Sequence, residues 1–104
     1  MFENNHNISS VVFSDDVHIL GDYAFRNCAN LRRIKFSKNL SAIGNSAFCN
    51  CLNIDNIDLA DTAIRQIGIA AFRNCIRLKS IKLPKFINKL PSFCFDSCIH
   101  LRSI

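Results

Sequence analysis

Tryptophan is absent from the sequence, and glycine and proline are rare, with three and two residues among 104. No low-complexity linker is therefore available to separate two domains, and we expect one domain over residues 1–104. No run approaches the roughly 20 consecutive apolar residues that a membrane-spanning helix requires. The opening MFENNHNISS lacks the positive start and apolar run of a secretory leader. The simplest prediction is a cytoplasmic location, with the cell surface as the alternative if a leader was trimmed or export is unconventional.

Acidic residues are nearly missing from the C-terminal part of the chain, and the net charge is +5. Residues 1–61 hold five Lys/Arg and seven Asp/Glu, whereas residues 62–104 hold eight Lys/Arg and one acid, Asp96. This asymmetry indicates either a solvated surface, which we favour, or a surface for an anionic partner. Hydrophobic residues make up 49% of the chain, which is enough for a continuous core and excludes wholesale disorder.

The phenylalanines reveal an internal repeat of 23 or 24 residues. Five of them, spaced 23, 23, 24 and 23 residues apart, are Phe2, Phe25, Phe48, Phe72 and Phe95. The residues three positions later are Asn5, Cys28, Cys51, Cys75 and Cys98. The residues nine positions later are Val11, Ile34, Ile57, Ile81 and Ile104. The coils that this register predicts lie near residues 2–24, 25–47, 48–71, 72–94 and 95–104, the last one partial.

Each half of the repeat predicts a local structure. The segment L-x-x-I-x-L ends in alternating apolar and polar residues, such as Ile34, Lys35 and Phe36, which is typical of a short strand with one buried face. The segment I-G-x-x-A-F-x-x-C spaces its apolar residues as a helical turn or two would. Glycine at its start permits a turn or a close backbone approach. One such unit cannot bury its apolar face alone, so the coils must stack.

These residues resemble the BspA-like class of leucine-rich repeats, whose pattern runs I-G-x-x-A-F-x-x-C-x-x-L-x-x-I-x-L-P. Residues 67–84, IGIAAFRNCIRLKSIKLP, match every fixed position. The resemblance implies an α/β leucine-rich-repeat solenoid, a right-handed arc of about four and a half coils over this chain. A parallel β-sheet would line its concave face, and short helical turns would line its convex face. The resemblance also implies a binding scaffold, of a kind found in surface and intracellular proteins, with no shared catalytic residue.

The ends of the chain depart from a closed solenoid. The first coil begins in mid-repeat and has Asn5 where the others have Cys, and the last stops at Ile104 on a strand position. No polar capping segment is visible at the C-terminus, although solenoids usually need one. We therefore expect either a fragment of a longer array or association through the uncapped ends, since an unpaired strand edge invites pairing.

The six cysteines favour a structural role. Four of them share one inward column, where Cys behaves as a small hydrophobe and a disulfide along the stack would be strained. We expect free thiols, with disulfides or a metal as less favoured alternatives, and this favours a reducing compartment. Cys94 takes the place of an alanine and should be buried, whereas Cys49 should be more exposed and the most reactive thiol. Cys49-Asn50-Cys51 alone is a weak metal signal.

No motif of a known catalytic or cofactor site is present. The histidines His6, His18 and His100 fall in different columns, and nothing places a base beside an activated thiol. The sequence lacks a phosphate-binding glycine loop, a zinc-protease motif and a nucleophile elbow. We therefore predict no enzyme activity, no cofactor and no metal.

The outward strand positions are the candidate partner-binding site on the concave face. The selected residues are Arg32, Arg33, Lys35, Asp55, Asn56, Asp58, Lys79, Lys82 and Arg102. Neighbouring strands would present the triplets Lys35–Asp58–Lys82 and Arg32–Asp55–Lys79 side by side. We favour a self-neutralising charge ladder, worth about 0.2–1 kcal/mol per pair. The alternative is a basic patch whose central aspartates suit a partner that carries both signs of charge.

The function predicted from the sequence is a non-catalytic module that binds a protein partner through the concave face. One alternative is a surface-associated or secreted adhesin-like repeat fragment. Another is polyanion binding through the basic C-terminal half, which would depend steeply on salt. Nucleic acid is disfavoured because the exposed positions lack the interleaved aromatic residues on which bases stack.

Overall fold

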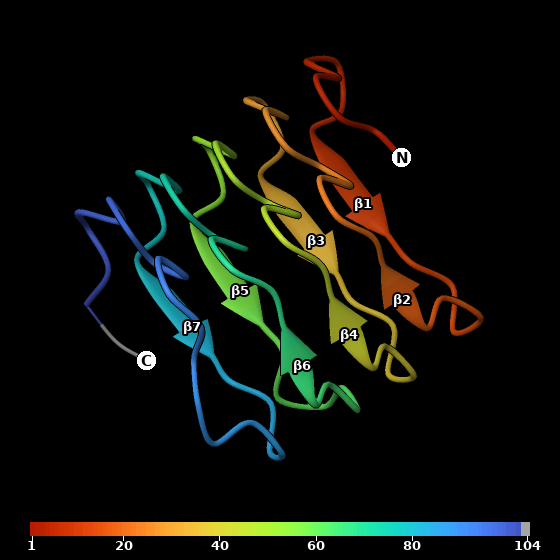
Figure 1. The fold of residues 1–104 in the computed structure, drawn as a ribbon. Helices are drawn as coiled ribbons and strands as arrows, with labels where there is room; N and C mark the ends of the chain where they lie inside the picture. Colours follow the sequence, from red (N-terminus) through yellow and green to blue (C-terminus); the bar gives the residue numbers. More distant parts are fainter. Residues whose placement is uncertain (103–104) are drawn as a thin grey trace.

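The computed structural model describes residues 1–102, which form seven short strands joined by turns. The strands are β1 (Ser10–Val12), β2 (Ile19–Leu20), β3 (Arg33–Lys35), β4 (Ala42–Ile43), β5 (Asn56–Asp58), β6 (Gln66–Ile67) and β7 (Ser80–Lys82). Odd-numbered and even-numbered strands form two separate rows, and successive coils lie side by side along the molecule (Figure 1). We call β1, β3, β5 and β7 the major row, and β2, β4 and β6 the minor row.

The register of both rows follows the sequence repeat. In the major row β1 pairs in parallel with β3, and β5 with β7, so that Ile57 lies opposite Ile81. In the minor row β4 pairs in parallel with β2 and β6, and Ile43 lies opposite Leu20 and Ile67. The predicted parallel strands are confirmed. The repeat pattern did not predict the minor row, or the absence of a strand ladder between β3 and β5 in the described residues.

The predicted helical turns are wrong for the described residues, which contain no helix. The α part of the expected α/β class is therefore wrong for these residues as well. Chained tight turns occupy these segments instead. Two positions in each of the last four such segments, and one in the first, have positive φ, a region that right-handed helices do not use. The non-glycine residues with positive φ are Asn4, Tyr23, Asn27, Ser46, Asn50, Ala70, Asn74, Phe93 and Ser97.

Backbone hydrogen bonds explain why turns replace the helix. The Ala24 and Arg26 N–H groups donate to carbonyls three residues back in the same coil, at 3.3 and 3.2 Å. Between them, the Phe25 N–H donates across to the Ala47 carbonyl of the next coil, at 2.7 Å. An α-helix would commit each N–H to a carbonyl four residues back in its own segment. Because successive N–H groups alternate between an acceptor in their own coil and one in the next coil, the backbone groups are hydrogen-bonded and neighbouring coils are joined at the same time.

Asparagine supports these turns in a column that the sequence analysis did not single out. Asn27, Asn50 and Asn74 each have φ between 62° and 63°, which asparagine tolerates better than most residues. Each donates its side-chain amide to the asparagine of the preceding coil, beginning at Asn4, over 2.7 to 2.8 Å. Since the column lies two residues after each Phe, its recurrence in the sequence was the signal that could have revealed it.

The regular recurrence of glycine along the repeat reflects the close approach of neighbouring coils. A Cβ at Gly44 would lie 2.5 Å from the Asp22 backbone nitrogen, and one at Gly68 would lie 2.4 Å from the Asn45 backbone nitrogen. At Gly21, in the first coil, a Cβ would meet nothing within 4 Å. None of the three has positive φ. The glycine column is therefore required for packing between coils and not for an unusual backbone conformation.

One apolar cluster runs along the stack between the two rows. Phe25, Phe48 and Phe72 are fully buried, and their rings stack with centroids 5.3 and 5.6 Å apart. Leucine, isoleucine and alanine columns fill the remainder of the cluster, as the repeat predicts. No helix in the described range is long and apolar enough to span a membrane. The predicted strand stop at Ile104 lies outside the described residues.

Candidate binding face

The exposed side of the major row carries the residues that the sequence analysis selected. Ile57 and Ile81 point into the core with exposed fractions of 2%, while the flanking Asn56, Asp58 and Lys82 are exposed. This alternation confirms the period of two predicted for the strands. We call this surface the major face.

The nine selected residues occupy two levels of the major face. Those within strands are Arg33, Lys35, Asn56, Asp58 and Lys82. Arg32, Asp55 and Lys79 directly precede β3, β5 and β7, respectively, and Arg102 shares their column of the repeat. Asp55 is half-buried, and the other eight are exposed. The selected residues are therefore accessible on this side of the molecule, and their role in binding stays a prediction.

The charge ladder predicted across this face forms only in part. Arg32 Nε lies 3.5 Å from Asp55 Oδ2, so one predicted pair is present. Asp58 and Lys82 are register partners on β5 and β7, yet no ion pair joins them in the part of the chain that the structure describes. Lys35 and Asp58 both line one hollow between β3 and β5, yet no ion pair joins them in the described residues either. Of the contacts predicted within the two charged triplets, the described residues therefore form one ion pair, between Arg32 and Asp55.

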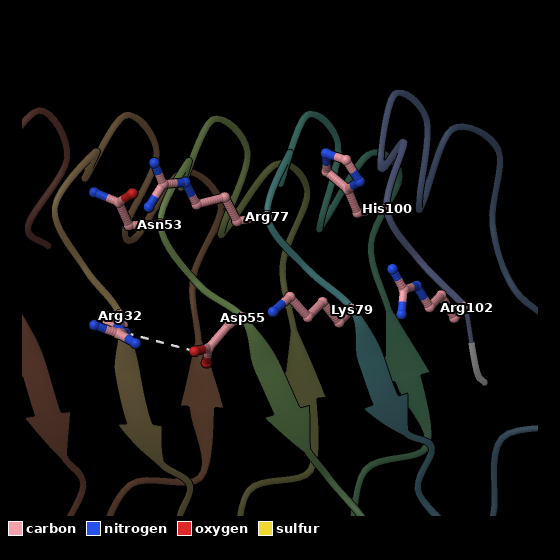
Figure 2. Close-up of a pocket in the computed structure, with 7 residues that line it drawn as sticks. All are labelled: Arg32, Asn53, Asp55, Arg77, Lys79, His100 and Arg102. Carbon is pink, nitrogen blue, oxygen red and sulfur yellow. Dashed lines mark ion pairs between the residues drawn. The ribbon is translucent and has the colours of Figure 1, made fainter.

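The major face contains a basic hollow of about 440 Å³. Its lining residues are Arg32, Asn53, Asp55, Arg77, Lys79, His100 and Arg102. Figure 2 shows them in two rows: Asn53, Arg77 and His100 lie in the loops, and the others lie nearer the strand starts. Arg77 and His100 were missed because the sequence analysis considered only strand positions. They share the column five residues after each Phe, which could have identified them.

A second hollow of about 540 Å³, the mixed hollow, lies where β3 and β5 fail to pair. Its lining residues are Asp15, Ile34, Lys35, Phe36, Lys38, Asp58, Asp61 and Thr62. Lys38 Nζ lies 3.8 Å from Asp15 Oδ2. Asp61 and Thr62 belong to the turn that absorbs the extra residue of the 24-residue coil. The turn of the 24-residue coil therefore contributes to the lining of this hollow.

The thiols are free, as predicted, and four of them have a shared structural contact. Each Cys of the inward column donates its S–H to the carbonyl of a Phe in the preceding coil, at 3.1 to 3.3 Å. Burial raises the pKa of Cys94 to about 12 and also raises the pKa of Cys49. Contact with the Cys75 side chain lowers the pKa of Cys98, which is half-buried in the last coil. We therefore predict that Cys98, rather than Cys49, is the most reactive thiol.

Metal-ligating side chains do not gather in the described range: no group of three or more His, Cys, Asp or Glu residues is placed to hold an ion. Cys51 is buried and its S–H is directed to the Phe25 carbonyl, so the Cys49–Cys51 pair has no convergent geometry.

The stacked coils, the glycine and cysteine columns and the exposed strand face define a leucine-rich-repeat solenoid. The family model described as BspA type leucine rich repeat region (6 copies) matches residues 1–104. The chain belongs to this family, as its resemblance to the repeat pattern indicated. A search of curated proteins gives no match.

Solved bacterial structures share the fold. A leucine rich cell surface protein from Faecalibacterium prausnitzii is 34% identical over 92% of this chain, with a TM-score of 0.86. A leucine-rich repeat protein from Bacteroides ovatus is 28% identical over 98% of the chain, with a TM-score of 0.90. The pneumococcal vaccine antigen PcpA is 25% identical over 92%, with a TM-score of 0.80. The chain spans 25%, 26% and 24% of these three proteins, respectively.

Proposed function

We propose that the chain is a non-catalytic interaction module that binds a protein partner through the major face. The observation that carries the proposal is the continuous exposed surface formed by charged residues of successive coils, indented by two hollows. Repeat solenoids use such extended faces for binding because each coil adds a few side chains to one surface. Four of the six thiols donate their S–H groups to Phe carbonyls of the preceding coil, which gives them a structural role.

The experiment compares two variants with the same change in net charge. The face variant carries Arg33→Glu, Lys35→Glu and Lys82→Glu, and the control carries Arg65→Glu, Lys85→Glu and Lys89→Glu. Arg65 immediately precedes β6 of the minor row, and Lys85 and Lys89 are exposed after β7. Both variants are checked by circular dichroism and used with the wild type to capture partners from native lysate of the source organism.

We expect the wild type and the control to capture one shared partner that the folded face variant loses. Loss of the partner by both variants would show that the interaction depends on the net charge of the chain and not on the major face. Retention by the face variant would exclude the major face as the binding surface.

A second candidate function is that of a surface-exposed repeat protein. The observation that favours it is the 34% identity to a protein described as a leucine rich cell surface protein. Protease treatment of intact source cells tests it, because an exposed chain would be degraded while a cytoplasmic control protein survives. Survival of the chain under these conditions would support the cytoplasmic alternative.

A further inference from the structure

Unpaired basic side chains predominate in the basic hollow. Arg77, Lys79, His100 and Arg102 line it, and none of them forms an ion pair with another residue of the described range. The single acid of the lining, Asp55, is paired with Arg32 (Figure 2). Like charges held close together repel each other, so a bound anion would relieve this repulsion and gain attraction from several groups at once.

Backbone hydrogen bonds between coils fix the positions from which these side chains extend. The Lys79 N–H donates to the Asp55 carbonyl and the Arg102 N–H to the Lys79 carbonyl, each at 2.9 Å. The column before each strand is thereby tied from coil to coil, and the loop column of Arg77 and His100 runs beside it (Figure 2). A ligand would therefore meet charged side chains that are anchored at fixed positions of neighbouring coils and that can all reach the hollow.

We infer that the basic hollow binds an acidic peptide segment of a protein partner. This inference rests on the proposed function and specifies the chemistry of its partner. Side-chain carboxylates of the segment dock against the guanidinium groups of Arg77 and Arg102, which can each bind a carboxylate through two parallel hydrogen bonds. Lys79 adds a point charge between them.

The surroundings of the hollow favour a short peptide over a long polyanion. Asp55 occupies the hollow itself, and Asp58, Asp61 and Asp15 line the neighbouring mixed hollow. These carboxylates would repel a nucleic acid strand or sulfated glycan that continued across the major face. The lining also contains no Phe, Tyr or Trp on which a base could stack. A peptide can instead follow its acidic residues with neutral or basic ones.

Fluorescence anisotropy with the full 104-residue chain tests the inference. The probe is a labelled Gly-Glu-Glu-Glu-Glu-Gly peptide, with Gly-Gln-Gln-Gln-Gln-Gly as the neutral reference. The hollow variant carries Arg77→Glu and Lys79→Glu. The control carries Lys85→Glu and Lys89→Glu, which change the net charge equally and lie outside the lining of the hollow. Circular dichroism establishes that both variants are folded.

We expect the acidic peptide to bind in preference to the neutral one. The hollow variant should bind about tenfold more weakly and the control within about twofold, because contacting charges outweigh distant screened ones. Arg77→Lys should weaken binding less than Arg77→Glu, since it keeps the charge and loses the paired hydrogen bonds.

Three results would overturn the inference. They are no preference for the acidic peptide, equal weakening in both variants, or tighter binding of a heparin tetrasaccharide or a single-stranded oligonucleotide at the same residues. The face variant at Arg33, Lys35 and Lys82 leaves the hollow lining intact and should still bind the peptide. If the peptide does not bind but the partner capture succeeds, the binding of an acidic peptide in the hollow is rejected and the proposed function stands. If the peptide binds but the face variant still captures the partner, the wider major face is rejected as the binding surface.

Discussion

Interior and terminal coils carry the same residues in the same columns, yet they bury them to different extents. Phe48 has an exposed fraction of 0%, while Phe2 in the first coil has 40%, although each ring stacks on a neighbour. Cys75 is buried, whereas Cys98 of the same column is half-buried. The column decides which way a side chain points. The presence of a coil on each side decides how much apolar surface it loses to solvent, and hence how much it stabilises the fold.

The largest expected effect comes from truncating the phenylalanine column. Phe48→Ala should lower the free energy of unfolding by about 3–5 kcal/mol, because it leaves a cavity between two stacked rings. Phe2→Ala should cost well under half as much, since its ring has only one stacked neighbour and retains solvent contact. Urea denaturation followed by circular dichroism measures both changes. Equal losses would show that burial by both neighbours is not the controlling factor.

A smaller difference is expected in the glycine column. Gly68→Ala should destabilise the fold by about 1–3 kcal/mol, because the new Cβ would lie 2.4 Å from the backbone of the preceding coil. Gly21→Ala should be neutral or stabilising by up to about 1 kcal/mol, because its Cβ meets nothing within 4 Å and its φ suits alanine. The same denaturation experiment compares them. A loss at Gly21 as large as that at Gly68 would contradict the close-approach explanation.

The smallest effect concerns reactivity and not stability. With the pKa of Cys98 lowered and that of Cys49 raised, the Cys98 thiolate forms at lower pH, and its alkylation rate should rise earlier as pH increases. Cys75, whose pKa is raised by the Cys98 contact and burial, should react only on unfolding. Iodoacetamide labelling over about pH 6–9 with peptide mass mapping measures the order.

Cys98→Ser provides the control for this labelling, because it should remove the fastest phase and leave the slower ones. Faster modification of Cys49 in the wild type would restore the expectation drawn from the sequence and reject the assignment to Cys98.

The candidate site shows where inference from sequence stops. The register placed Arg32, Asp55, Lys79 and Arg102 in one column, and hydrogen bonds between coils confirm that three of them are tied in succession. The register could not show that the loop column of Arg77 and His100 lines the same hollow. Nor could it show that β3 and β5 do not pair, because a shared register places two strands side by side without fixing whether their backbone groups hydrogen-bond to each other.

The sequence by itself determined the repeat, the inward columns, the parallel strands and the burial of most thiols. Each of these follows from which residues recur every 23 or 24 positions, since recurring residues must stack on one another. Only the tertiary structure decided that turns replace helices, that a minor row of strands exists, and which basic side chains converge. These features depend on whether each backbone N–H finds its acceptor in its own coil or in the next one, and spacing along the chain does not encode that choice.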